Sequence, residues 1–157
     1  MMNTMSSESK KQKRLSEEIC KELYAKYETP ERVIKHCRAV GETGARIASA
    51  LNKAGYNFDV SLVRAAGLIH DLMRISDNHG EVAADLLESL GYVQEAKAVR
   101  NHMRYEFNAP ENITETDIFC LADRLVKEDE YVEVTPKNMR MRKILLDHLE
   151  RKRANKD

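Results

Sequence analysis

Carboxylate and imidazole side chains recur in this chain at positions that helical periodicity assigns to a buried face. Asp123 follows Phe119 by four residues and precedes Val126 by three, so it lies in the apolar stripe of a predicted helix. His70 and Asp71 are adjacent at the end of another apolar segment. Because a buried carboxylate is costly unless it is paired or coordinated, these positions indicate ion-pairing or metal-binding chemistry.

The set of residues is more informative than any one member. A single buried histidine is usually a hydrogen-bonded core residue, and a buried aspartate is often a helix cap or half of an ion pair. Here such residues recur on successive core-facing helices, while the three cysteines lack the spacing of a thiolate site. Mixed nitrogen and oxygen ligands suit iron, manganese, zinc or magnesium. The candidate ligands are His36, His70, Asp71, His102 and Asp123.

Helical periodicity predicts the elements that position these residues, and no segment alternates as a strand would. Asp59 is a predicted N-cap, Thr29 with Pro30 marks another helix start, and Thr114 with Asp117 resembles a capping box. We therefore expect an all-α bundle of six or seven helices, with residues 1–14 as a flexible arm and 15–157 as one domain. The expected helices span about 15–27, 30–54, 59–73, 78–90, 94–104, 115–128 and 136–153.

Composition excludes several classes of function. Twenty-six basic residues balance twenty-six acidic ones, which argues against sequence-independent binding of nucleic acids. No apolar run approaches the roughly 20 residues that cross a bilayer, and the polar start lacks the apolar segment of a secretion signal. We therefore expect a cytoplasmic protein that binds neither membranes nor nucleic acids.

Three segments carry a resemblance to a known family. They are KHCRAV at 35–40, AAGLIHD at 65–71 and LADRLV at 121–126. In these contexts, the order of His36, His70-Asp71, His102 and Asp123 resembles the HD superfamily of metal-dependent phosphohydrolases over residues 31–130. The short spacing from His70-Asp71 to the next histidine and the Ala-Asp at 122–123 also resemble two subgroups of that family. One hydrolyses symmetrical dinucleoside tetraphosphates, and the other is fused behind nucleotidyltransferases of the molybdenum-cofactor type.

The resemblance implies a metal centre with one or two divalent ions, from iron, manganese, magnesium, nickel and zinc. One ion would be held by His36, His70, Asp71 and Asp123. His79 and His102 would add ligands for a second ion, with Asp71 bridging the two. His79 follows Asp71 by only eight residues, so a buried residue at a helix start is the alternative interpretation.

A phosphohydrolase would also need cations for the non-reacting phosphate oxygens. Arg74 lies where many members of the family carry a lysine, and Lys35, Arg104 and Lys127 are weaker candidates. Arg124 is adjacent to Asp123 but is expected to point elsewhere on its helix. Asp71 and Arg74 are therefore the predicted catalytic residues.

Two functions remain open at this stage. The first is a phosphohydrolase that acts on a nucleotide or related small phosphoester through a metal-activated water. The alternative is a regulatory module that binds a metal or nucleotide with little turnover. The sequence leaves the oligomeric state undetermined.

Overall fold

The structure, a computed structural model, describes residues 13–126 of the 157-residue chain. This part consists of α-helices and two short 3-10 turns and contains no strand, so the prediction of an all-α fold is confirmed. The expected helix at 136–153 lies outside the described residues. The elements are α2 (Glu17–Lys26), α3 (Glu31–Lys53), α4 (Val60–Ile69), α5 (His79–Ser89), α6 (Val93–Arg100), η1 (His102–Arg104), η2 (Pro110–Asn112) and α7 (Glu115–Leu125).

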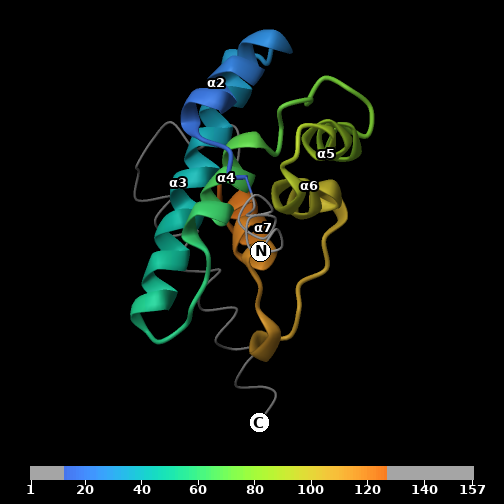
Figure 1. The fold of residues 1–157 in the computed structure, drawn as a ribbon. Coiled ribbons are helices and arrows are strands. Elements are labelled where there is room, and N and C mark those ends of the chain that lie inside the picture. The colour runs from blue at the N-terminus through green and yellow to red at the C-terminus, as the bar shows by residue number, and fades with distance from the viewer. Residues whose placement is uncertain (1–12, 127–157) are drawn as a thin grey trace, which may run out of the picture.

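The helices are arranged around α4, which is apolar on nearly every side. Seven of its ten residues are buried, from Leu62 to Ile69. In Figure 1, α4 and α7 lie between the long helix α3 on one side and the α5–α6 pair on the other. None of the described helices is long and apolar enough to cross a membrane.

Glycines allow α3 and α4 to approach each other at backbone distance. A Cβ atom added to Gly67 would lie 2.6 Å from the Cα atom of Gly41, and one added to Gly44 would lie 2.7 Å from Val63 Cγ1. An alanine at position 67 would therefore force the two helices apart. This close approach brings His36 of α3 and His70 at the end of α4 together, with 5.2 Å between their ring centroids.

The end of α4 differs from the sequence prediction, and contacts from α2 and the segment after it explain the difference. The predicted helix at 59–73 begins as expected, with the Asp59 side chain accepting from Leu62 N–H, but it ends at Ile69. The Tyr24 hydroxyl of α2 donates to Leu68 O, and the Thr29 hydroxyl donates to Leu72 O at 3.0 Å. Thr29 thus holds the turn after α4 rather than capping α3. Both hydroxyls are buried and fix the backbone on either side of His70 and Asp71.

The 3-10 turn η1 and the helix α7 carry the last two candidate ligands, His102 and Asp123. The predicted helix at 94–104 ends at Arg100, and His102 lies in the following 3-10 turn η1. The capping box of α7 is confirmed, since the Thr114 side chain accepts from Asp117 N–H and the Asp117 side chain accepts from Thr114 N–H. This cap sets the start of α7 and hence the rotational position of Asp123.

The segment before α2 contacts the helical body. Lys13, which we assigned to the flexible arm, donates to Leu90 O at 2.9 Å. Arg14, also assigned to the arm, lies 3.1 Å from the fully buried Glu95 of α6 and 2.9 Å from Asp59. Glu95 also accepts from Leu15 N–H at 2.9 Å, which gives its buried carboxylate two partners.

Candidate metal centre

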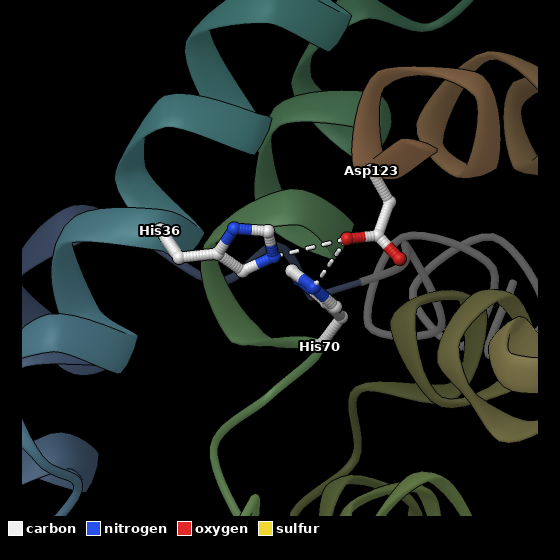
Figure 2. Close-up of side chains that lie close together, drawn as sticks. All are labelled: His36, His70 and Asp123. Atoms are coloured by element: carbon white, nitrogen blue, oxygen red, sulfur yellow. Dashed lines mark hydrogen bonds and ion pairs between the residues drawn. The ribbon is translucent and has the colours of Figure 1, made fainter. Parts of the chain in front are cut away.

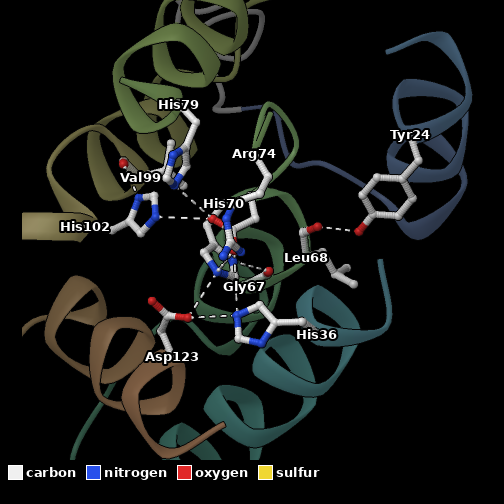
Figure 3. Close-up of polar contacts among 11 residues, drawn as sticks. Tyr24, His36, Gly67, Leu68, His70, Arg74, His79, Val99, His102 and Asp123 are labelled. Carbon is white, nitrogen blue, oxygen red and sulfur yellow. Dashed lines mark hydrogen bonds and ion pairs between the residues drawn. The ribbon is translucent and has the colours of Figure 1, made fainter. Parts of the chain in front are cut away.

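The structure brings together all six residues that the sequence suggested as ligands. They come from five elements between residues 31 and 125 and point toward a common centre (Figure 3). His36, His70, Asp71 and His102 are buried, and His79 and Asp123 retain some exposure. The residues lie on α3 (His36), at and after the end of α4 (His70, Asp71), at the start of α5 (His79), in η1 (His102) and on α7 (Asp123).

One half of the centre is formed by His36, His70 and Asp123. Asp123 Oδ1 lies 3.0 Å from His36 Nε2 and 3.1 Å from His70 Nε2. Figure 2 shows both rings pointing toward this oxygen. Each residue offers one donor atom, and these three atoms all lie within 4.8 Å of one another. Two imidazoles and a carboxylate at such separations have the donor chemistry and spacing of a metal site.

The other half is centred on Asp71, whose two oxygen atoms face different histidines. Oδ1 lies 3.2 Å from His79 Nε2 and 3.4 Å from His102 Nε2. Oδ2 lies 3.4 Å from His70 Nε2 and 3.7 Å from His36 Nε2. The carboxylate therefore stands between the two sets of imidazoles, as a bridging ligand would.

Backbone contacts determine which ring nitrogen of two histidines faces the centre. His70 Nδ1 lies 2.7 Å from Gly67 O, and His102 Nδ1 lies 2.7 Å from Val99 O. A carbonyl oxygen can only accept, so each Nδ1 carries its proton and donates. In a neutral ring the Nε2 atom then presents a lone pair toward the carboxylates, which is the orientation of a metal-binding histidine with a supporting hydrogen bond.

The Nε2 atoms that face the carboxylates indicate whether the site suits a metal ion. The Nε2 atoms of His70, His79 and His102 are buried and make no well-aligned hydrogen bond among the described residues. Yet each lies within 3.4 Å of a carboxylate oxygen. A nitrogen lone pair facing an oxygen lone pair is repulsive unless a proton or another cation lies between them. The donor set therefore fits a divalent cation.

The electrostatics of the centre lead to the same conclusion. Burial opposes ionisation of Asp71 and Asp123, but His70 and the other neighbouring imidazoles hold the pKa of each carboxyl well below its usual range. Burial also disfavours a charged His70, yet the two carboxylates raise the pKa of its ring well above the ordinary value. The centre thus attracts positive charge, and a bound metal would take the place of this proton.

The centre opens onto a cavity of about 390 Å³. Arg74 lines this cavity and is about one-third exposed, with its Nη1 3.2 Å from Asp71 Oδ2. Arg124 also lines it, although we expected it to point elsewhere. Its guanidinium is held 4.7 Å from the Phe107 ring centroid, and this long-range contact has no signal in the sequence. Met103 and Val126 add apolar surface to the cavity.

The other cations suggested by the sequence are not part of this cavity. Lys35 is exposed on α3 and is not among its lining residues. Arg104 lines a neighbouring cavity, and Lys127 lies outside the described residues.

We expect stability to depend on the metal, because a ligand that binds only the folded state stabilises it. Free metal at 100 times its Kd contributes about 2.7 kcal/mol, or roughly 5–10 °C in Tm for a domain of this size. Chelator should lower Tm in a thermal melt, and manganese, iron or nickel should restore it. Calcium, which prefers all-oxygen ligands, should give a smaller shift. A melting curve that responds to neither chelator nor metal would show that the six side chains satisfy one another.

His79 distinguishes a one-ion centre from a two-ion centre. Its Nε2 atom contacts Asp71 Oδ1, on the side of the carboxylate opposite the His36 half. If it is a ligand of a second ion, His79→Ala should lower the metal content measured by elemental analysis from about two ions toward one while the protein stays folded. His148→Ala, which removes the remaining histidine of the chain, is the control. An unchanged metal content in His79→Ala would assign His79 a structural role.

Comparison with known proteins gives one family match. The model of a family described as the HD domain matches residues 33–128, which is more than half of the chain and includes all six candidate ligands. An uncharacterized protein of Methanocaldococcus jannaschii is 43% identical over 65 residues, which is 40% of this chain. That match spans only 38% of the length of the relative. No solved structure matches the chain.

Proposed function

The chain belongs to the HD domain family, whose members are generally metal-dependent hydrolases, and we propose that it hydrolyses the phosphoester of a nucleotide or a related small molecule. The observation that carries this proposal is the placement of Asp71. Its carboxylate has imidazoles on both sides, and the group faces an open cavity that also contains Arg74 and Arg124. A structural metal site has no need of such an opening.

Each half of the centre would hold one ion. His36, His70 and Asp123 would be ligands on one side, His79 and His102 on the other, and Asp71 would contribute to both. A metal pair of this kind supplies a water of lowered pKa and stabilises charge on phosphate oxygens. Gly67 O and Val99 O, which accept from His70 and His102, would keep both rings in the orientation that ligation requires.

The arginines of the cavity would bind the phosphate oxygens that do not react. Arg74 has a forked guanidinium that suits a phosphate, and it already lies beside the carboxylate that would bridge the ions. Arg124 of α7 is held against Phe107 and donates to Tyr105 O at 3.2 Å, so it adds a second positive charge to the cavity lining. The apolar side chains of Met103 and Val126 would limit the access of water.

The test is release of phosphate from small phosphoesters by metal-loaded protein. Purified protein is stripped with chelator, reloaded with manganese or iron, and assayed with nucleoside mono-, di- and triphosphates and with dinucleoside tetraphosphates. The last of these tests the proposed similarity to the tetraphosphate hydrolases. We expect metal-dependent, saturable turnover of at least one nucleotide. If the protein binds metal and nucleotide but releases nothing, it is a regulatory module instead.

A further inference from the structure

A second cavity of about 370 Å³ adjoins the metal cavity, and nothing in the proposed chemistry uses it. His79 and Met103 line both cavities, so the two are neighbours across these side chains. The volume lies within the range of small-molecule sites. The lining of this cavity includes the side chains of Asn78, Glu81, Asn101, Met103 and Arg104.

The walls of the second cavity are continuous with one half of the metal centre. The start of α5 places His79 against Asp71 Oδ1 and places Asn78 and Glu81 along the second cavity. Likewise, η1 places His102 against the same oxygen, while Met103 and Arg104 line the cavity. A molecule with its phosphate at the metal centre would have to extend past His79 and Met103 to reach this cavity.

Four of the polar side chains that line this cavity have no partner within residues 13–126. Asn78, Glu81, Asn101 and Arg104 make no side-chain hydrogen bond or ion pair there, and Asn78 leaves α5 without a side-chain cap. Asn78 also has a positive φ of 54°, in the left-handed region that asparagine adopts more readily than most residues. Met103 is 65% exposed, although it is a large apolar side chain.

The charge of the second cavity is poorly suited to a polyphosphate. Arg100 lines the cavity, but its guanidinium is engaged by Asp85 at 3.0 Å and Glu88 at 3.2 Å. The remaining charges, Glu81 and Arg104, have opposite signs. Among the described residues, a chain of phosphates would meet one carboxylate and one cation without an ion pair, whereas the metal cavity holds Arg74 and Arg124.

The chemistry of these side chains fits a nucleoside. Two amides can donate to and accept from the edge of a base, and a carboxylate can accept from ribose hydroxyls. The exposed thioether of Met103 and the planar guanidinium of Arg104 can cover the faces of a base. We propose that the second cavity binds the nucleoside of a nucleoside monophosphate whose phosphate lies in the metal cavity. This inference rests on the proposed function and specifies its substrate.

The first experiment measures binding without hydrolysis, so that it does not depend on turnover. Metal-loaded protein is titrated by calorimetry with adenosine, guanosine, cytidine and uridine, which carry no phosphate. At least one should bind, and Asn101→Ala and Met103→Ala should each raise its Kd about tenfold, the effect of losing about 1.4 kcal/mol. Lys97→Ala, which removes an exposed cation of α6 that does not line the cavity, should leave the Kd unchanged.

The second experiment compares substrates. For the same variants, kcat/KM for the nucleoside monophosphate is divided by kcat/KM for p-nitrophenyl phosphate, which has no nucleoside. This ratio should fall at least tenfold in Asn101→Ala and Met103→Ala. If the ratio and the nucleoside Kd both stay at wild-type values, the inference is wrong even when nucleotides are hydrolysed. Tighter binding of tripolyphosphate than of any nucleoside, lost in Arg104→Ala, would also overturn it. Nucleoside binding that the variants weaken, without hydrolysis of any phosphoester, would support the site and contradict the proposed function.

Discussion

Replacing Asp71 by alanine is expected to remove bound metal almost completely and to lower the hydrolysis rate at least about 1000-fold. Asp71 is the only candidate ligand with an oxygen toward each half of the centre, at 3.2 Å from His79 Nε2 and 3.4 Å from His70 Nε2. Its loss removes charge and a donor atom from both proposed ion sites at once. Metal catalysis supplies several kcal/mol of transition-state stabilisation, and about 4 kcal/mol corresponds to a factor of 1000. Elemental analysis and phosphate release measure the two effects.

The matched control is Asp77→Ala, which removes an exposed carboxylate six residues further along the same connection. This variant should retain the wild-type metal content and rate. Asp71→Asn, which preserves the shape of the side chain, should still lose metal, because a neutral amide cannot balance two cations. Metal content at the wild-type level in Asp71→Ala would contradict the bridging role and leave His36, His70 and Asp123 as the whole site.

Replacing Arg74 by alanine is expected to lower kcat/KM by roughly 30- to 1000-fold while the metal remains bound. This range corresponds to about 2–4 kcal/mol for the loss of one charge-assisted contact to a transition-state oxygen. Arg74 lines the cavity and also lies 3.2 Å from Asp71 Oδ2. It could therefore bind the phosphate or position Asp71. The roles differ in their consequences. A phosphate-binding role predicts unchanged metal content, whereas a role in positioning Asp71 predicts weaker metal binding.

Metal titrations and steady-state kinetics on the same preparations of Arg74→Ala separate these roles. Arg74→Lys should recover part of the rate, because a lysine keeps the charge but not the forked geometry. Arg46→Ala, which removes an exposed arginine on the later part of α3, should behave as wild type. A full rate in Arg74→Ala would transfer the phosphate contact to Arg124, the other arginine of the cavity.

Local sequence signals predicted most helix starts correctly, because a helix start depends on neighbouring residues. Asp59 caps α4, and Thr114 with Asp117 forms the capping box of α7, both as expected. The helix ends at Ile69 and Arg100 were predicted too late. The end at Ile69 depends on tertiary contacts, because the Tyr24 and Thr29 hydroxyls donate to backbone carbonyls on either side of it. Residues 59–73 alone carry no signal for these contacts.

The residue types of the centre were visible in the sequence. Histidines and aspartates on apolar helix faces stand out, because burying such side chains costs free energy unless they are paired or coordinated. The order of His36, His70-Asp71, His102 and Asp123 also carried the resemblance to the HD superfamily, which the match over residues 33–128 confirms at the level of the family. The two subgroups named from the sequence remain proposals.

Only the tertiary structure showed which of these residues face one another and which residues line the cavities. The two oxygens of Asp71 face different histidines because α5 and η1 approach it from one side and α3 approaches it from the other. Arg124 enters the cavity because Phe107, seventeen residues earlier, holds its guanidinium, and Glu95 is buried because Arg14 reaches it across the fold. The second cavity exists because the start of α5 and the turn η1 come together. Periodicity and spacing describe each helix along its own axis, whereas these contacts depend on the packing of one helix against another.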